Sequence, residues 1–178
     1  CGYHSWQDWY VGKTSKNSGV PAEISKLSHR FIYGDKKSID KLFKKFANKI
    51  ACVIIDPLPA IESKPNKNFL KYLEKKCKEK KIVYIFDEVV CGFRYLDKSV
   101  QGNIDIKPDL SAFSKGIANG MPISALVGKK NIMKKFSDIF YSLTFAGETL
   151  SLAAAREVLK IHNNLDIPSY IDRQGLRL

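Results

Sequence analysis

The spacing of apolar residues changes several times along the chain between a helical and a strand-like pattern. Apolar side chains recur every three or four positions over residues 39–46, 69–77 and 150–162. This spacing places them on one face of a helix, so the sequence predicts three amphipathic helices. Residues 12–37 are instead rich in Gly, Ser and Lys, and we expect them to form a surface loop.

Short, mostly apolar runs alternate with these helices, at residues 51–55, 82–86, 110–113 and 123–127. Runs without regular polar alternation are typical of parallel strands that helices cover on both faces. Repeated helix-then-strand units indicate an α/β protein. We therefore predict a doubly wound, mainly parallel sheet with helices on both faces.

Polar residues follow three of the predicted strands. Asp56-Pro57 follows the first strand, Asp87-Glu88 ends the second, and Ser114-Lys115-Gly116 follows the third. Open parallel sheets bind their ligands at the carboxyl ends of the strands. We therefore expect the chemistry of this protein at that edge of the sheet.

Asp87 and Lys115 are the strongest candidates at this edge. A carboxylate at the end of an apolar strand is partly desolvated and needs a cationic or hydrogen-bonding partner. Lys115 stands among small and apolar sequence neighbours, where an amine loses its proton more easily and can form a Schiff base with a carbonyl. On spacing alone, a structural Asp–Lys ion pair is an equally good interpretation.

The charge of the chain first suggests a nucleic-acid partner, since 30 Lys and Arg residues against 18 Asp and Glu give a net charge of +12. Only five of the thirty are Arg, the residue best suited to bidentate hydrogen bonds with bases and phosphates. Many lysines also fall on the polar faces of the predicted helices. We expect a solvated surface and no nucleic-acid partner, with a basic nucleic-acid-binding module as the lesser alternative.

The cysteines and the apolar runs limit the location of the protein. Cys1, Cys52, Cys77 and Cys91 lack CxxC spacing, so we expect no metal site. Cys52 and Cys77 occupy apolar positions and are interpreted as reduced core residues of a cytoplasmic protein. No apolar run approaches the roughly 18 residues of a membrane-spanning helix, and we expect no membrane association.

A nucleotide hydrolase is disfavoured by the surroundings of its one candidate motif. Gly12-Lys13-Thr14 resembles the end of a P-loop, but Gln7 stands where the motif needs its first Gly. No buried strand precedes the segment either.

Four longer runs carry a family resemblance. They are GYHSWQDW (residues 2–9), FDEVVCGFR (86–94), PDLSAFSKGIANGMPISALVG (108–128) and TFAGETLSLAAA (144–155). In this order they resemble the large domain of the class III aminotransferases, fold-type I enzymes that depend on pyridoxal 5'-phosphate (PLP). The second and third runs are most similar to the glutamate-1-semialdehyde aminomutase branch.

The resemblance implies a role for individual residues. Lys115 matches the lysine that forms the Schiff base with PLP and then moves a proton, and Asp87 matches the carboxylate that faces the pyridine nitrogen. Val89 and Tyr3 match the side chains that lie against the two faces of the ring. Thr144 matches a hydroxyl that reaches the PLP phosphate of a neighbouring subunit, so a homodimer with shared active sites is implied.

The FDEVVCGFR run contains two further charged residues, Arg94 and Glu88. We expect Arg94 to pair with a carboxylate within the fold rather than to bind substrate. Glu88 is expected either to orient the substrate or to support the loop that follows it.

The resemblance also implies an activity and a domain organisation. We expect PLP-dependent transamination of a small amino or keto compound through Lys115, with glutamate-1-semialdehyde 2,1-aminomutase activity as the alternative. Residues 1–165 correspond to the central part of the PLP-binding large domain, and residues 166–178 begin the segment that leads to a C-terminal small domain. Because the family's phosphate-binding turn and small domain lie outside this match, we expect a fragment that is inactive alone.

Overall fold

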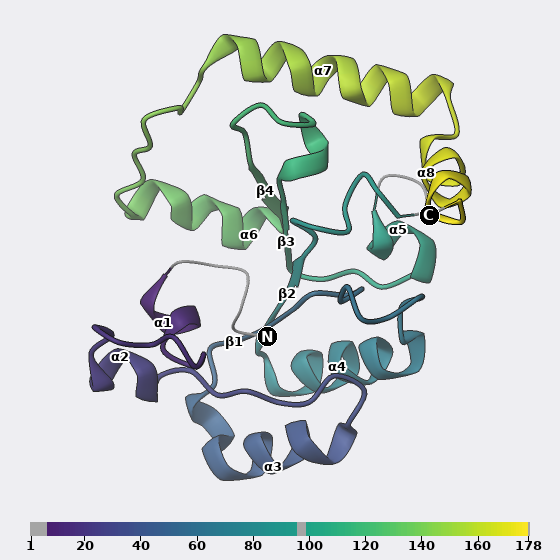
Figure 1. Ribbon diagram of the computed structural model, residues 1–178. Coiled ribbons are helices and arrows are strands. Elements are labelled where there is room, and N and C mark those ends of the chain that lie inside the picture. Colours follow the sequence, from purple (N-terminus) through teal and green to yellow (C-terminus); the bar gives the residue numbers. More distant parts are fainter. Residues whose placement is uncertain (1–6, 96–98, 178) are drawn as a thin grey trace. The chain divides into compact units, whose positions relative to one another are not determined.

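The computed structural model describes residues 7–95 and 99–177 (Figure 1). The chain forms two compact units, Cys1–Ala51 and Cys52–Leu178. The candidate chemistry lies almost entirely in the second unit, which contains the sheet.

The first unit is helical in its described part. It contains α1 (Asp8–Val11), α2 (Ala22–Lys26), α3 (Lys36–Phe46) and the 3-10 turn η1 (Ala47–Lys49). The Asp35 carboxylate caps α3 by accepting the backbone N–H of Lys37 at 2.8 Å, and the helix buries Ile39 and Phe43.

Helix α2 corrects the expectation of a loop over residues 12–37. It follows Pro21, whose ring fixes φ near −58°, and the Ser25 hydroxyl donates to the Gly12 carbonyl at 2.8 Å. Five residues are too few to show a helical repeat of apolar positions, so the pattern along the chain contained no sign of this helix.

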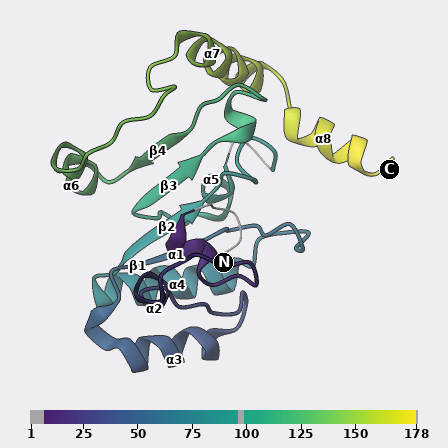
Figure 2. The same cartoon turned by 60° about the vertical axis from the view of Figure 1, so that its left-hand side comes forward.

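The second unit is built on a four-stranded sheet with the order β1-β2-β3-β4 (Figure 2). The strands are β1 (Cys52–Ile55), β2 (Val83–Asp87), β3 (Leu110–Phe113) and β4 (Ala125–Gly128). The pairs β1-β2 and β2-β3 are parallel, whereas β4 runs antiparallel to β3. The predicted α/β class and mainly parallel sheet are thus confirmed, and these four strands lie in sequence order.

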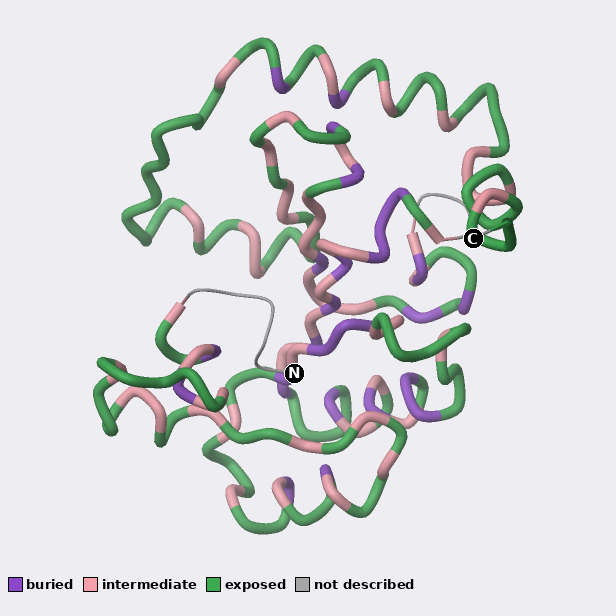
Figure 3. Tube along the Cα trace, in the orientation of Figure 1, coloured by how far each residue is buried: buried purple, intermediate pink, exposed green. Residues whose placement is uncertain are grey.

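Helix α4 (Lys67–Lys80) connects β1 to β2 and packs against β2. The Asn66 side chain caps its first turn by accepting the Phe69 N–H at 3.1 Å. Its apolar residues Phe69, Leu70, Leu73 and Cys77 are fully buried, while most of its lysines are exposed (Figure 3). On this helix the lysines therefore form a solvated face, as the charge pattern indicated.

Burial alternates along β2 and separates the two faces of the sheet. Tyr84 and Phe86 are buried at 2% and 0% exposure, whereas Val83, Ile85 and Asp87 are half-buried. The Tyr84 hydroxyl donates to the Leu70 carbonyl of α4 at 3.4 Å. Asp87 therefore lies on the more open face of the sheet, where a ligand can approach it.

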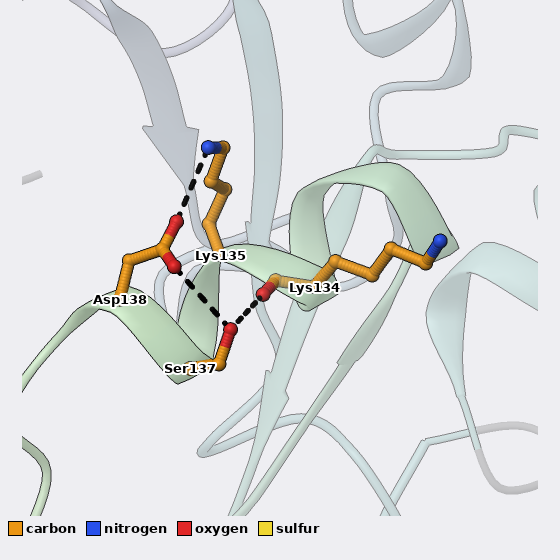
Figure 4. A network of polar contacts seen from close by, with 4 residues as sticks. All are labelled: Lys134, Lys135, Ser137 and Asp138. Carbon is orange, nitrogen blue, oxygen red and sulfur yellow. Dashed lines mark hydrogen bonds and ion pairs between the residues drawn. The ribbon is translucent and has the colours of Figure 1, made fainter.

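Shorter elements complete the second unit. They are α5 (Val100–Ile104), η2 (Lys115–Ile117), α6 (Lys130–Met133) and η3 (Lys134–Asp138). In η3 the Lys135 ammonium pairs with the Asp138 carboxylate at 3.1 Å, and the Ser137 hydroxyl lies 2.8 Å from the Lys134 carbonyl oxygen (Figure 4). The Lys134 side chain itself points away from this network.

Two capped helices end the chain. Glu148 caps α7 (Thr149–Asn164) by accepting the N–H groups of Leu150 and Ser151 at 2.6 and 2.7 Å. Asp166 caps α8 (Ile167–Gly175) through the Ser169 N–H at 3.2 Å. Between η3 and α7 the chain exposes several large apolar side chains: Ile139, Phe140, Tyr141, Leu143 and Phe145.

The three described cysteines are free thiols. Cys77 and Cys91 are buried, but Cys52 is exposed, which corrects its interpretation as a core residue. Cys52 is the first residue of β1 and lies on the less covered side of that strand. Within residues 7–95 and 99–177, no cluster of His, Cys, Asp and Glu is arranged to hold a metal ion, and no helix is long and apolar enough to cross a membrane.

Candidate active site

Asp87 and Lys115 extend from the carboxyl ends of two neighbouring parallel strands. Asp87 is the last residue of β2 and pairs in register with Ala112 of β3. The register continues one residue further, since the Glu88 N–H donates to the Ala112 carbonyl at 2.9 Å. Lys115 follows Ala112 by three residues. The two groups thus lie at the same edge of the sheet, which is the placement that the sequence predicted.

The Asp87 side chain begins the turn that follows β2. Its Oδ1 atom accepts the backbone N–H of Val89 at 3.2 Å, a turn geometry that Asp favours. Val89 therefore lies beyond the strand, and this hydrogen bond, rather than strand alternation, relates it to Asp87. Both side chains are half-buried.

Lys115 occupies an unusual backbone conformation. Its φ is +46°, in the left-handed region that few residues other than Gly and Asn adopt. Its carbonyl accepts the Asn119 N–H at 2.9 Å, which closes the turn. Such backbone strain is typical of functional sites. The side chain is exposed, so its apolar sequence neighbours do not enclose the amine as the sequence suggested.

Lys115 lines a pocket of about 360 Å³ together with Arg94, Ser114 and residues 120–123. The Ser114 hydroxyl donates to the Ile123 carbonyl at 2.9 Å, which ties Ser114 to the loop of residues 120–123 that lines the same pocket. Arg94 is exposed and donates from Nη1 to the Val90 carbonyl at 3.1 Å. Among the described residues no carboxylate forms an ion pair with Arg94, which corrects the expectation of an internal partner.

Two turns that carry these cations pack directly against each other. A Cβ atom on Gly116 would lie 3.0 Å from the Gly92 carbonyl oxygen and 3.6 Å from Cγ of Arg94. The Phe93 ring holds the first turn in place through an edge contact with Phe113 of β3, at 5.8 Å between ring centroids. The positions of Arg94 and Lys115 are thereby coupled through backbone contact.

Glu88 is fully buried behind the site, on the side of the chain opposite Asp87. Its carboxylate accepts the N–H groups of Val100 at 2.6 Å and Gln101 at 3.3 Å, at the start of α5. The Gln101 amide in turn donates to the Ser111 hydroxyl at 2.9 Å. Glu88 therefore ties the end of β2 to α5 and, through α5, to β3.

Burial raises the pKa of Glu88, and the nearby charge of buried Asp56 adds to that rise. The hydrogen bonds from Val100 and Gln101 act in the opposite direction. Burial raises the pKa of the Cys91 thiol as well, again with a contribution from Asp56. The carboxyl ends of β1 and β2 thus enclose a group of buried acidic side chains.

The structure brings three of the five predicted site residues to one edge of the sheet. Asp87, Val89 and Lys115 lie at one edge of the sheet. Thr144 is exposed in the turn before α7, and within the described part of the chain no hydrogen bond or ion pair joins it to the other three. Tyr3 lies outside the described residues, so its stacking role stays a prediction.

Sequence reasoning underestimated two residues. Arg94 belongs to the Lys115 pocket, and Glu88 anchors the chain behind Asp87. The sequence did indicate the burial of Glu88. It directly follows Asp87 at the end of a strand, and successive side chains of a strand point to opposite faces, so Glu88 must point to the covered face. No sequence pattern indicated that the Arg94 turn folds back onto Gly116.

Comparison with known proteins agrees with this geometry. The family model for class-III aminotransferases matches residues 19–178. Glutamate-1-semialdehyde 2,1-aminomutase of Clostridium botulinum (strain Alaska E43 / Type E3) is 38% identical over 166 residues, which are 90% of this chain and 39% of that protein. The same enzyme of Thermosipho melanesiensis is 36% identical over 165 residues, which are 89% of this chain and 39% of that protein. The chain thus spans about two-fifths of the length of these relatives.

Solved structures show the same likeness. The FumI protein of Sphingopyxis sp. MTA144, in its PLP internal aldimine form, is 30% identical with a TM-score of 0.83, covering 92% of this chain and 40% of FumI. An omega-transaminase from Sphaerobacter thermophilus, 24% identical, shares the fold with a TM-score of 0.77 over 89% of this chain and 42% of its own. The family model, the relatives and the fold agree, and the chain belongs to the class-III aminotransferase family.

Proposed function

We propose that the protein carrying this chain transfers amino groups with PLP, using Lys115 and Asp87. The observation that carries this proposal is the placement of an amine and a carboxylate at the carboxyl ends of two paired strands, β2 and β3. FumI, which has the same fold, holds PLP in its solved structure. The chain covers about two-fifths of the length of its relatives, so the activity is proposed for the protein that carries it.

The residues present fit PLP. An aldehyde cofactor needs an accessible primary amine, and Lys115 is exposed at the wall of a pocket of about 360 Å³. A pyridine ring needs an acceptor for its N–H, and Asp87 is half-buried on the more open face of the sheet. Val89 stands two residues beyond Asp87 and offers an apolar side chain for contact with the ring.

Each side chain would contribute a distinct step. When bound, PLP supplies an electron sink for the electron pair left on the substrate Cα. Asp87 would keep a proton on the pyridine nitrogen, which strengthens that sink. Lys115 would hold the cofactor through its Nζ atom, and as a free amine it would be the base that takes the proton from the substrate Cα.

The second candidate function is the aminomutase reaction, in which the amino group returns to a neighbouring carbon of the same molecule. It is favoured by the names of the curated relatives, which are glutamate-1-semialdehyde 2,1-aminomutases. The two functions differ in their need for a second substrate. An aminomutase converts one compound without an added keto acid, whereas a transaminase requires one.

We propose further that the enzyme is a homodimer in which Thr144 serves the partner's site. The turn around Thr144 exposes Phe140 at 96% and Phe145 at 58%, which is a large apolar surface for a free monomer. A second copy of the chain would cover it. Free thiols at Cys77 and Cys91 support a cytoplasmic location, where thiols stay reduced.

The experiment uses the full-length protein and its visible absorption. We expect a band from PLP bound to lysine, and formation of a new amine from an amino donor and a keto acceptor. Lys115→Ala should abolish both, whereas Lys134→Ala, which changes an exposed lysine of η3, should leave both intact. A wild-type protein that takes up no PLP, or a Lys115→Ala protein with full activity, would refute the proposal.

A further inference from the structure

We propose that Glu88 is a positioning residue of the cofactor site, which fixes the direction of the Asp87 carboxylate from the covered face of the sheet. This inference rests on the proposed PLP function, in which Asp87 faces the pyridine nitrogen. Within the described residues a single hydrogen bond, from the Val89 N–H at 3.2 Å, holds the Asp87 carboxylate. Its direction therefore depends on the backbone that carries it.

The backbone of Glu88 is bound on both sides. Its N–H donates to the Ala112 carbonyl of β3 at 2.9 Å, which extends the pairing of β2 with β3 one residue beyond Asp87. Its own carbonyl accepts the Gly92 N–H at 2.9 Å, which closes the turn after β2. The N–H of Glu88 belongs to the planar peptide group that joins it to Asp87. This group cannot rotate without losing its bond to β3.

The side chain of Glu88 holds the same point from the other face. Its carboxylate accepts the Val100 N–H at 2.6 Å and the Gln101 N–H at 3.3 Å, at the start of α5. The Gln101 amide donates in turn to the hydroxyl of buried Ser111 at 2.9 Å. Because successive side chains of an extended chain point to opposite faces, a Glu88 held on the covered face keeps Asp87 on the open face.

These contacts form a closed loop. The backbone of Glu88 reaches Ala112, and its side chain reaches Ser111 through Gln101. Ser111 and Ala112 are consecutive residues of β3, so both ends of the loop meet on one strand. A group that is held by a surrounding network of hydrogen bonds keeps its geometry more accurately than one that is held by a single contact.

The cost of burying this carboxyl group favours a role beyond stability. Glu88 is fully buried, and moving a polar group out of water costs free energy that its hydrogen bonds mainly offset. Well-packed apolar side chains often stabilise such positions as well or better. In some proteins a buried polar group is retained because it fixes one arrangement of the chain. The arrangement that Glu88 fixes contains Asp87.

The test measures the pH at which the visible band of PLP bound to Lys115 changes in the full-length protein. A proton on the pyridine nitrogen opposes a second positive charge on the Schiff-base nitrogen, and so lowers the midpoint of this change. Glu88→Gln keeps one acceptor but places an NH₂ group against the second backbone donor. If Asp87 then turns away, the ring loses its proton more easily. The midpoint should rise by about one pH unit, and PLP should bind about tenfold more weakly.

Two further variants separate positioning from stability. In an Asp87→Asn protein the carboxylate is absent, so adding Glu88→Gln should not move the midpoint further. Ile104→Val is the matched control, because it removes one methylene from a buried residue of α5 without removing a hydrogen bond. It should lower the melting temperature and leave the midpoint unchanged.

Gln101→Met covers the case that Glu88→Gln fails to fold. It keeps the length of the side chain but breaks the link to Ser111, and the midpoint should rise here too. An unchanged midpoint in Glu88→Gln, or in Gln101→Met where only that variant folds, would overturn the proposal. So would an equal rise in the Asp87→Asn background or in Ile104→Val, because Glu88 would then act without Asp87 or through stability alone. A wild-type protein that takes up no PLP would instead refute the proposed function itself.

Discussion

Gly116 lies against the carbonyl of Gly92, so closely that a Cβ on Gly116 would be 3.0 Å from that oxygen. The surroundings of Gly92 are tighter still, because a Cβ there would lie 2.8 Å from Cδ1 of Phe113 and 2.6 Å from the Glu88 carbonyl oxygen. These two glycines allow the turn after β2 to touch the turn after β3. The site therefore depends on the absence of two side chains as well as on the presence of Asp87 and Lys115.

Replacement of Gly92 by Ala should push apart the turn after β2 and the turn after β3. Overpacking of this kind usually costs about 1–3 kcal/mol, and we expect a lower melting temperature of the full-length protein together with weaker PLP binding. Gly175→Ala is the matched control, since among the described residues no atom outside its own helical turn lies within 4 Å of its Cβ position at the end of α8. It should leave stability unchanged or raise it slightly. Equal melting temperatures for Gly92→Ala and wild type would contradict the packing argument.

The strands and the sheet edge of the site could be predicted from the sequence, but the contact between the two turns could not. The strands were predicted because buried parallel strands need apolar runs, and the edge that holds Asp87 and Lys115 follows from the direction of those strands. The contact between the Gly92 and Gly116 turns depends on two positive φ angles, at Phe93 and Lys115. Neither Phe nor Lys favours a positive φ. The pocket that Arg94 lines therefore could not be derived from the spacing of apolar residues.

Burial of Glu88 should make stability depend on pH. Its pKa is raised above the ordinary value of 4.5, mainly by burial. An acid with a raised pKa binds its proton more tightly in the folded state, so its contribution to stability is complete below about pH 4.5 and is lost as the pH rises through the folded-state pKa. Gln does not titrate. As the pH rises from about 4 to about 8, we expect the melting temperature of the wild type to fall relative to that of Glu88→Gln.

Differential scanning calorimetry of the two apoproteins across this range measures the effect. Glu88→Ala should destabilise the protein at every pH, because it leaves the Val100 and Gln101 N–H groups without their acceptor. A difference between wild type and Glu88→Gln that stays constant with pH would show that Glu88 is ionised alike in the folded and unfolded states.

The cap of α7 should respond to pH in the opposite sense. Hydrogen bonds from Ser151 and from the Leu150 N–H lower the pKa of Glu148. A lowered pKa means that the stabilisation is present above about pH 4.5 and disappears as the pH falls through the folded-state pKa. Glu148→Ala should therefore melt below the wild type at neutral pH, and the gap should narrow in acid.

Glu148→Asp provides the control for this helix cap. Asp is a strong N-cap residue, so this variant should keep most of the wild-type stability at neutral pH. The same thermal scans at about pH 7 and about pH 3 compare all three proteins. A gap for Glu148→Ala that is independent of pH would assign the loss to packing rather than to the ionised cap.

The proposed sharing of Thr144 between subunits can be tested with mixed dimers. Thr144→Val removes the hydroxyl and keeps the shape of the side chain, and PLP should bind about tenfold more weakly to this variant, as expected for one lost hydrogen bond to a charged group. Lys115→Ala removes the lysine but keeps Thr144. In a mixed dimer, the Thr144→Val subunit carries the intact Lys115. If Thr144 serves the partner's site, the site of that lysine receives the intact Thr144 of the Lys115→Ala subunit. Co-expressed and purified mixed dimers should therefore contain one site with wild-type PLP affinity.

The arrangement within a single subunit gives a different result. If Thr144 served the Lys115 of its own chain, every intact lysine in the mixed dimer would belong to a site that lacks the threonine hydroxyl, and the affinity would stay at the weak level of Thr144→Val. Ser142→Ala, at a neighbouring exposed hydroxyl in the same turn region, is the control and should bind PLP as the wild type does. Titration of the visible absorption with PLP distinguishes these cases, because it counts only sites that retain Lys115. Weak affinity in the mixed dimer would assign Thr144 to its own subunit, and a Thr144→Val protein with wild-type affinity would remove Thr144 from the cofactor site.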